Sequence, residues 1–499
     1  MKMPNFCVIL IILDSVRADI LYELVQTNRM PYLKKYIFDR AAVAENCFTS
    51  FPTNTVPGHL AILTGTYADK HHVPAMKLWN LSKMHFRDYS GISIFDLLKQ
   101  EFNPKIKMIY NFFSDSEAFT ASSFAKGARY TYLNRNRMIF FYLIQKLNYK
   151  IVLIQSLKVL LRHLKKKITG MLYVIWIPIT DIISHEKGPD SQELLHNLQE
   201  IDQMLFKLLF EGYKKWKGFK ELGSLNSTYF FITADHGSFT IRKRSKLIQN
   251  FKSIPLRIKH KQAPLKTLNK SDLLIAYTDG FASLYVKNPI SNNWNDKVEY
   301  SQLITYPTSK GPINLIEFIL KIPTVSHVFV KKEKVYLIFS IDGTSQIKRK
   351  TENGEIFLSY QVLSGKDPFD YNKNHVLNEL RDGTFYPYHK LVEPLSKTNY
   401  PTMLDQIPRL FNCENMGDIL FMGKEGCSFN QKNNYRGTHD TGTYLCSRVP
   451  FIAAGPNIKH IRIPTVRTVD IVPTILYLLK KSSNYQQFDG RVLSEIIKE

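Results

Sequence analysis

Three aspartates and three histidines lie at four places in the chain, each of which follows an apolar strand pattern or adjoins glycine. They are Asp14, Asp181, His185, Asp235, His236 and His439. Each alone has a commoner role, the aspartates as helix N-caps and the histidines as ordinary core or surface residues. Together, carboxylate oxygens and imidazole nitrogens form a ligand set that suits Zn²⁺. Asp181 and His185 are four positions apart, so on a helix both side chains point the same way.

A threonine in the stretch T-V-P-G-H is the candidate nucleophile. Thr55 precedes a short helical pattern, HLAILTG, whose free N–H groups and positive dipole end favour an anion such as phosphate. A threonine hydroxyl is a poor nucleophile until it is deprotonated, and a bound metal achieves that. The commoner role of a threonine at this position is N-capping.

Alternation of strand and helix patterns predicts the scaffold that positions these residues. Apolar runs typical of strands in a parallel sheet occupy residues 5–13, 105–113, 171–178 and 227–234. Helical patterns lie between them, notably at 93–102 and 191–213. We therefore predict a doubly wound, mainly parallel α/β sheet. Ligands bind at the carboxyl ends of strands in such sheets.

The chain changes character in its third quarter. A basic, Pro-interrupted stretch begins near residue 241, and later segments alternate like antiparallel strands. We predict that 1–240 is the first part of an α/β catalytic core, 241–435 an inserted α+β lid, and 436–499 the last part of the core.

Composition excludes several classes of protein. The chain has 499 residues, of which 44% are hydrophobic and 22% charged, so it is not a disordered tail, a collagen-like repeat or a disulfide miniprotein. Five cysteines without a C-x-x-C pair predict reduced thiols. The net charge of +24 suggests a nucleic acid or an anionic membrane as partner. A general drift toward lysine explains it better, and no specific nucleic-acid binding is predicted.

No apolar run reaches the roughly 20 residues that span a membrane. The run Val8–Leu13 is short and lacks a cleavage site, so we predict a cytoplasmic protein, with non-classical secretion as the alternative. Residues 138–167 are apolar with periodic Lys and Arg. Either they form a basic helix on a membrane surface, or they pack on the core with a solvated lysine face. The second is favoured, and an anionic membrane surface stays a candidate partner.

The motifs resemble the alkaline phosphatase superfamily, in its type I phosphodiesterase/nucleotide pyrophosphatase branch. The matching stretches, between residues 8 and 456, are ILDSVRAD, TVPGHLAILTGTYADKHHV, TDIISHEKGPDS, TADHGS, GTHD and RVPFIAAGP. Their order, spacing and strand context all agree. The resemblance implies an alkaline phosphatase-like core, a small phosphate ester or nucleotide as substrate, and cleavage of phosphodiester or phosphoanhydride bonds.

The resemblance also implies two Zn²⁺ or similar divalent ions. The ligands implied are Asp181, His185 and His439 for one ion, and Asp14, Asp235 and His236 for the other, with Thr55 bridging toward both. Thr55 would attack phosphorus and form a covalent phospho-threonine.

Two departures leave the substrate open. Gly58 stands where the nucleotide pyrophosphatases typically carry Asn, which favours a phosphomonoesterase or phosphonate hydrolase of the same superfamily as an alternative. In that variant an Asn usually holds a phosphoryl oxygen, but Met76 occupies the expected place, and the neighbouring Lys77 is the substitute that we predict.

Two aromatic residues near the nucleophile, Tyr67 and Trp79, are candidates to stack on a substrate's base, with core packing as the alternative. A basic membrane- or polyanion-binding protein with weak catalysis is the rival prediction from another class. Transferases of the same fold usually carry membrane helices, which are not evident here. The oligomeric state is left open.

Overall fold

The computed structural model describes most of the chain. The residues described are 6–90, 101–113, 118–122, 130–131, 149–151, 153–154, 157–158, 160–162, 165, 171–373, 377, 379–430, 434–482 and 484–498. Nearly all of the helix predicted at 93–102, and most of the stretch 138–167, lie outside these residues.

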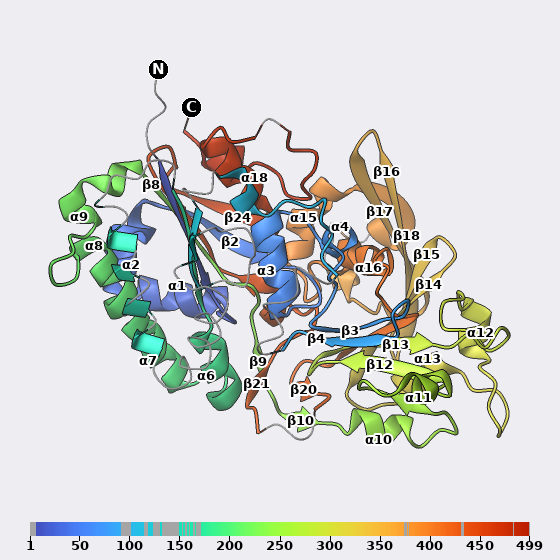
Figure 1. The fold of residues 1–499 in the computed structure, drawn as a ribbon. Helices are drawn as coiled ribbons and strands as arrows, with labels where there is room; N and C mark the ends of the chain where they lie inside the picture. Colours follow the sequence, from blue (N-terminus) through green and yellow to red (C-terminus); the bar gives the residue numbers. More distant parts are fainter. Residues whose placement is uncertain are drawn as a thin grey trace.

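A nine-stranded sheet forms the centre of the molecule, with helices on both faces (Figure 1). Its strands run in the order β22-β2-β23-β8-β1-β7-β5-β6, and β24 pairs with β2. The middle strands are β1 (Cys7–Leu13), β7 (Leu172–Ile177) and β8 (Thr228–Thr233), which are parallel and buried along their whole length. The others are β2 (Ala42–Phe48), β5 (Ala118–Ser122), β6 (Tyr130–Thr131), β22 (Arg448–Val449), β23 (Phe451–Ala454) and β24 (Ile461–Arg467). The predicted α/β class with a mainly parallel sheet is confirmed.

Helices join these strands. In the first half they are α1 (Ala18–Gln26), α2 (Pro31–Tyr36), α3 (Thr55–Thr64), α4 (Ala68–His71), α6 (Ile179–Lys187), α7 (Gln192–Ile201), α8 (Leu208–Glu211) and α9 (Phe219–Leu222), and near the end α17 (Tyr444–Ser447) and α18 (Ile471–Leu478). The helical pattern at 191–213 corresponds to α7, a π-helical turn at Asp202–Lys207 and α8.

The strand predicted at 105–113 is wrong, because this segment forms a 3₁₀ turn, Ile109–Phe112. The Asn111 side chain accepts a hydrogen bond from the Met108 N–H at 2.9 Å, and such local bonds compete with a strand ladder. Met108, Ile109 and Tyr110 are nevertheless buried in the central core, which accounts for the apolar run.

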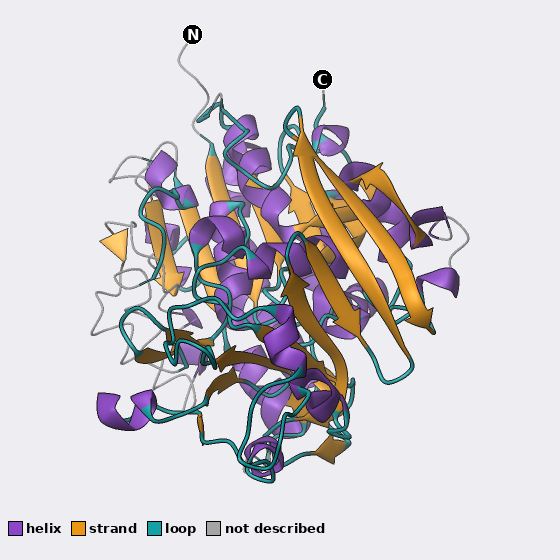
Figure 2. Cartoon of the chain, turned by 90° about the vertical axis from the view of Figure 1, so that its right-hand side faces the viewer, coloured by secondary structure: helices purple, strands orange, loops and turns teal. Residues whose placement is uncertain are grey.

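A second nine-stranded sheet lies in the part of the chain between β8 and β22, and Figure 2 shows its long strands from the front. Its strands, in spatial order, are β11 (Ile258–Lys259), β12 (Leu273–Tyr277), β13 (Phe281–Val286), β19 (Ile419–Gly423), β14 (Val325–Lys332), β15 (Val335–Phe339), β16 (Gly343–Glu352), β17 (Glu355–Gly365) and β18 (Asp382–Pro387). Neighbours are antiparallel except β11 and β12. The boundaries of the inserted lid stay a prediction.

Helices and short strand pairs complete this region. The helices are α10 (Leu247–Phe251), α11 (Leu265–Asn269), α12 (Tyr300–Ile304), α13 (Leu315–Leu320), α15 (Tyr388–Ser396) and α16 (Met403–Phe411). The short pairs are β3 (Lys77–Asn80) with β4 (His85–Asp88), β9 (Phe239–Thr240) with β21 (Gly437–Thr438), and β10 (Lys243–Arg244) with β20 (Cys427–Ser428).

The described residues between 149 and 165 are helical. Leu153, Leu157, Leu160 and Leu161 are all buried in the central core, which supports the core-packing interpretation of this basic segment. Among the described residues no helix combines the length and the apolar character needed to cross a membrane. The cytoplasmic location stays a prediction. All five cysteines are buried free thiols.

A buried arginine ties the second sheet's region to the central one. Arg409, in α16, is 1% exposed, and its guanidinium donates hydrogen bonds to Asp405 at 2.8 Å and to Asp69 and Asp489 at 3.0 Å each. Asp69 lies in α4, and Asp489 accepts the Tyr67 N–H at 2.9 Å. Because three carboxylates converge on one buried cation, its loss would remove the positive charge that they share. Lys70, 3.0 Å from Asp489, and Arg349, 3.8 Å from Asp405, would remain as nearby cations.

We expect Arg409→Leu to lower the free energy of unfolding by about 3–5 kcal/mol, because it removes the cation that the buried carboxylates share. Arg257→Gln is the matched control, since Arg257 pairs with Asp272 at 2.7 Å but its side chain is 66% exposed. The control should cost less than about 1 kcal/mol. Denaturant unfolding measures both, and equal losses would contradict the assigned role of Arg409.

Candidate active site

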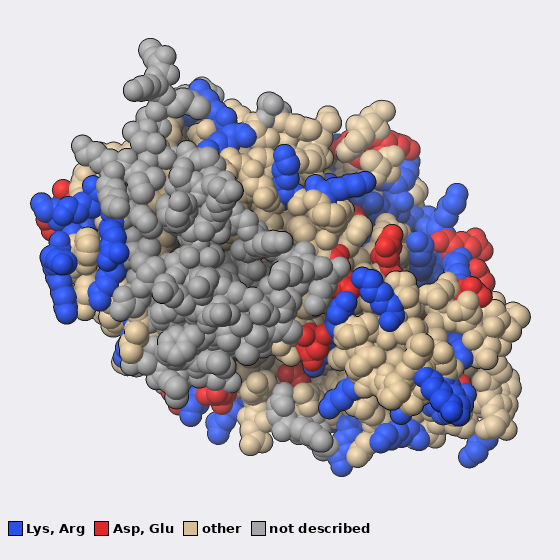
Figure 3. Space-filling view, in the orientation of Figure 1, with Lys and Arg blue, Asp and Glu red and all other residues tan. Residues whose placement is uncertain are grey.

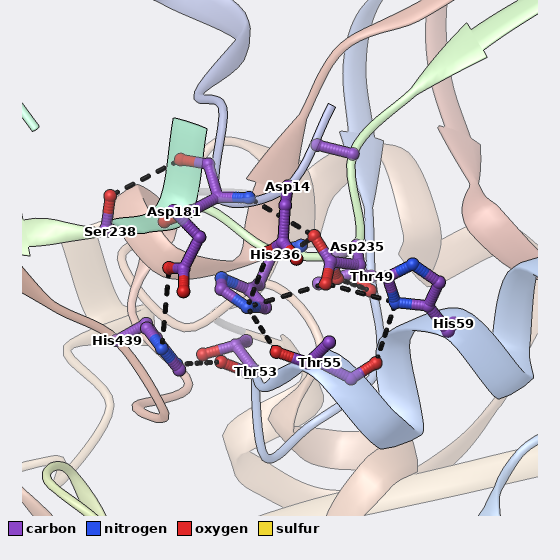
Figure 4. A network of polar contacts seen from close by, with 12 residues as sticks. Asp14, Thr49, Thr53, Thr55, His59, Asp181, Asp235, His236, Ser238 and His439 are labelled. Carbon is purple, nitrogen blue, oxygen red and sulfur yellow. Dashed lines mark hydrogen bonds and ion pairs between the residues drawn. The ribbon is translucent and has the colours of Figure 1, made fainter. Parts of the chain in front are cut away.

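Three aspartates meet at the carboxyl edge of the central sheet (Figure 4). Asp14 directly follows β1, Asp235 follows β8 after one residue, and Asp181 lies in the first turn of α6, just after β7. Because β1, β7 and β8 are parallel neighbours, their carboxyl ends bring these three side chains together.

One group of potential ligands joins Asp14, Asp235 and His236, whose ligand atoms lie within 4.8 Å of one another. His236 Nε2 lies 3.5 Å from Asp14 Oδ1 and 3.5 Å from Asp235 Oδ2. All three side chains are at most 2% exposed. Trp176 Nε1–H donates to Asp14 Oδ2 at 2.7 Å, and the Ser15 N–H donates to Asp235 Oδ1 at 3.2 Å, so both carboxylates are held in place.

A second group joins Asp181, His185 and His439. His185 Nε2 lies 3.5 Å from Asp181 Oδ1 and 3.2 Å from His439 Nε2, and His439 Nε2 lies 3.9 Å from Asp181 Oδ1. Asp181 and His185 share one side of α6, as their spacing predicts. Ligand atoms of Asp181, His439 and His236 also lie within 4.8 Å of one another, so His236 stands between the two groups.

Backbone carbonyls fix the orientation of all three imidazoles. The Nδ1 atoms of His185, His236 and His439 lie 2.8, 3.1 and 3.0 Å from the carbonyl oxygens of Gly437, Gly237 and Thr53. A proton on Nδ1 satisfies each carbonyl and leaves a lone pair on Nε2, the usual state of a metal-binding histidine. The Nε2 atoms of His185 and His439 face each other at 3.2 Å, so a proton or a metal cation between them removes the repulsion of two lone pairs.

The oxygen atoms of the three carboxylates, like the imidazoles, indicate a cation site. Asp14 Oδ1, Asp181 Oδ1 and Asp235 Oδ2 are buried and accept no well-aligned hydrogen bond within the described part of the chain, although His59 Nδ1 lies 3.2 Å from Asp235 Oδ2. Burial and the nearby charges of Asp235 and Asp181 raise the pKa of Asp14 well above its ordinary value. Unsatisfied buried carboxylate oxygens beside imidazole Nε2 atoms are the donors that divalent cations bind, so these residues fit a pair of metal ions.

Thr55 faces this cluster from the first turn of α3. Its Oγ1 lies 3.4 Å from His236 Nε2, and its backbone carbonyl lies 2.9 Å from His59 Nδ1. The predicted nucleophile is thus brought to the six predicted ligands at the positive end of a helix.

Gly58 is required by close packing behind the nucleophile. A Cβ added at Gly58 would lie 2.4 Å from the carbonyl oxygen of Asp235, which is backbone and cannot swing away. Gly58 is also fully buried in α3, so its place in the structure is to let this helix approach Asp235. Its predicted contact with substrate has no support from this placement.

Tyr67 and Trp79 are not brought to the cluster. Tyr67 is 1% exposed, with its ring 4.8 Å from the Arg409 guanidinium. Trp79 is 0% exposed and donates its Nε1–H to the Ile275 carbonyl at 3.3 Å. Both rings pack in the interior, the alternative considered for them, and neither lines the cavity at the cluster.

That cavity has a volume of about 640 Å³ and opens over Thr55, Asp181 and His439. Met76 and Lys77 both line it, and Lys77 Nζ lies 3.4 Å from Asp88 Oδ2. Lys77 is therefore within the space that a substrate would occupy, as predicted for it, although its contact with substrate stays a prediction.

Two residues in the quoted motifs were not singled out from the sequence. Asp440, directly after His439, has its Oδ1 2.9 Å from His439 Nδ1. Burial alone would lower the pKa of His439, but Asp440 and Asp181 raise it to about 10. His59 Nδ1 lies 3.2 Å from Asp235 Oδ2. Its spacing of four from Thr55 on α3 was the available signal.

The fold and this convergence of carboxylates, imidazoles and a helix-terminal threonine define the alkaline phosphatase superfamily. Within it, the chain belongs to the type I phosphodiesterase / nucleotide pyrophosphatase family, whose model matches residues 8–297, more than half of the chain. The class of reaction that this match supports is hydrolysis of phosphoester bonds.

Two curated relatives match shorter stretches. The chain is 26% identical over 241 residues to the bis(5'-adenosyl)-triphosphatase ENPP4 of Bos taurus, which covers 46% of this chain and 47% of that protein. It is 24% identical over 255 residues to GPI ethanolamine phosphate transferase 1 of Homo sapiens, which covers 47% of this chain and 24% of the transferase. The chain thus spans about half of the first relative and a quarter of the second.

We expect Gly58→Ala to reduce phosphoesterase activity and to destabilise the fold by about 1–3 kcal/mol, because overpacking must push α3 away from Asp235. Gly423→Ala is the control, since a Cβ there would meet nothing closer than 3.6 Å. Activity and thermal unfolding of both variants test this, and a fully active, equally stable Gly58→Ala protein would refute it.

Proposed function

We propose that the chain is a two-metal phosphodiesterase that cleaves phosphodiester or phosphoanhydride bonds through a covalent phospho-threonine on Thr55. The observation that carries this proposal is the convergence of three unsatisfied carboxylate oxygens on the imidazole Nε2 atoms beside the Thr55 hydroxyl. The match to the phosphodiesterase family supports the class of reaction.

The residues that would hold the ions form two sets. They are Asp181, His185 and His439 for one ion, and Asp14, Asp235 and His236, with Thr55, for the other. When bound, two divalent cations, most suitably zinc for this donor set, would neutralise the carboxylates and lower the pKa of the Thr55 hydroxyl.

The chain's own groups perform the displacement. Thr55 Oγ1 attacks phosphorus, the bond from phosphorus to the leaving oxygen breaks, and the leaving group departs with the electron pair and takes up a proton. Water then cleaves the phospho-threonine, which regenerates the hydroxyl and releases the phosphorylated product. Trp176 and Ser15 hold the two central carboxylates throughout, and α3 directs its positive end at the reacting phosphate.

The substrate that we propose is a small phosphate ester or nucleotide. A cavity of about 640 Å³ has room for groups beyond the phosphate, and its lining combines the basic side chains of Lys77, His260 and Lys261 with several carboxylates. The name of the first relative, a bis(5'-adenosyl)-triphosphatase, supports a nucleotide.

Cleavage of monoesters or phosphonates is the second candidate, because Gly58 replaces the Asn typical of nucleotide pyrophosphatases. All six predicted metal ligands are present, which counts against the alternative that the chain is a binding protein with weak catalysis.

We expect Thr55→Ala to lower kcat about a thousandfold or more, because it removes the hydroxyl that lies 3.4 Å from His236 Nε2 in the ligand cluster. Thr55→Ser should retain a measurable fraction of activity and form an acid-stable phosphoserine. Hydrolysis of bis(p-nitrophenyl) phosphate, p-nitrophenyl phosphate and a dinucleoside polyphosphate by each variant measures this and ranks the substrates. Full activity of Thr55→Ala would exclude the covalent mechanism.

Removal of metal should lower both activity and the midpoint of thermal unfolding, and Zn²⁺ should restore both, because bound cations offset the repulsion among the buried carboxylates. Asp14→Asn should abolish the Zn²⁺-induced rise in the midpoint, yet stabilise the metal-free protein, since it removes one of the repelling charges.

Asp418→Asn is the control for this test. Asp418 is a half-buried aspartate whose pKa desolvation raises to about 7, but its carboxylate accepts the Val286 N–H in the second sheet. This variant should keep the full Zn²⁺-induced shift. Loss of the shift in both variants would mean that the shift does not report on the proposed site.

A further inference from the structure

A tight hairpin between α8 and α9 presents lysines on an aromatic base. Its sequence is GYKKWKGFK, residues 212–220. The N–H groups of Tyr213 and Trp216 donate to each other's carbonyl oxygens at 2.8 and 2.9 Å, which closes the turn. Lys214 and Lys215 form its exposed tip.

Close backbone contacts make this hairpin rigid. A Cβ on Gly212 would lie 2.5 Å from the carbonyl oxygen of Trp216, and a Cβ on Gly218 would lie 2.4 Å from the Gly212 nitrogen. The two ends of the hairpin therefore approach as closely as glycine alone allows. The lysines at the tip therefore stand on a closely packed turn.

The basic helical segment packs beside the hairpin and adds its own cations. Lys158 Nζ lies 5.4 Å from the centroid of the Tyr213 ring, and the Arg162 guanidinium lies 5.3 Å from that of Trp216. The buried Leu157 and Leu161 hold this segment on the core, so its charged residues face outward. We call the resulting patch the basic surface; it comprises Lys158, Arg162, Lys214, Lys215, Lys217 and Lys220.

Positive charge dominates this patch. Residues 205–222 contain five lysines and only two acidic residues, Glu211 and Glu221. Glu221 already pairs with Lys217 at 3.5 Å. In Figure 3, Lys and Arg side chains gather along the left edge of the molecule, where Figure 1 shows the loop between α8 and α9 projecting. Clustered lysines of this kind attract polyanionic surfaces.

The basic surface lies away from the candidate active site. The ligand cluster is at the carboxyl ends of β1, β7 and β8, whereas Figure 1 shows the loop between α8 and α9 at the left edge of the molecule, and no residue of the basic surface lines the cavity over Thr55. A partner that covers the hairpin therefore leaves the cavity over Thr55 open.

We propose that the basic surface binds an anionic phospholipid membrane. The hairpin projects rather than forming a groove, which fits a flat surface, and tyrosine and tryptophan beside lysine are suited to the interface of a bilayer. Single-stranded nucleic acid fits less well, because it binds by stacking bases on aromatic faces. Here each ring already has two cations over it, Lys158 and Lys214 at Tyr213, and Arg162 and Lys215 at Trp216.

The test is binding of the full chain to vesicles of phosphatidylcholine with and without phosphatidylserine. We expect binding only when phosphatidylserine is present, and weaker binding as salt rises. Each lysine near an anionic bilayer strengthens binding about fivefold, so the triple variant Lys214→Glu, Lys215→Glu, Lys217→Glu should weaken it at least about a hundredfold. Activity on a soluble phosphate ester and the thermal midpoint should stay unchanged.

The control reverses the same number of charges elsewhere. Lys297, Lys332 and Lys334 line a separate hollow beside β15 in the second sheet's region, and their replacement by Glu should leave vesicle binding nearly unchanged. Equal losses in both triple variants would mean that net charge, not this surface, attracts the membrane and would overturn the proposal. Absence of binding to phosphatidylserine vesicles would also overturn it, as would an oligonucleotide that displaces the vesicles by binding the same lysines.

Discussion

Three carboxylates of like charge are buried together at the end of a parallel sheet, and the rest of the site compensates for that burial. As a result, the pKa values of Asp14 and Asp235 shift in opposite directions. Burial and neighbouring acids raise the pKa of Asp14, whereas His236 and His59 outweigh the effect of burial on Asp235 and hold its pKa below the ordinary range. A cluster that keeps unsatisfied carboxylate oxygens in its interior is stable only with positive charge nearby.

The candidate site also depends on contacts between parts of the chain that are far apart in sequence. His439 and Asp440 follow the second sheet's region in sequence, and Asp440 Oδ2 accepts the Asp279 N–H at 3.1 Å from the turn between β12 and β13. Arg409 also joins the second sheet's region to the central one, through its ion pairs with Asp69 and Asp489. The second sheet thus does more than cover the site, because it holds one of the histidines in position.

Much of the central fold and the site was predictable, because buried parallel strands are continuous apolar runs and each of the three central ones ends near an aspartate. The strand predicted at 105–113 is wrong because an apolar run indicates burial and not the type of element. Its apolar residues are buried in a turn rather than in a strand. Tyr67 and Trp79 show that closeness in sequence to a nucleophile does not place a ring at the site. The need for Gly58 arises from the Asp235 carbonyl, 177 positions away in the chain, a contact that no local pattern encodes.

The order of these residues along the chain has a consequence for biosynthesis. Asp14 is translated before the second sheet, whereas His439 is translated only after the whole of that sheet. The cluster is therefore incomplete in every nascent chain that has not yet reached His439. A translation product that ends within the second sheet therefore lacks His439 and Asp440, and with them part of the ligand cluster.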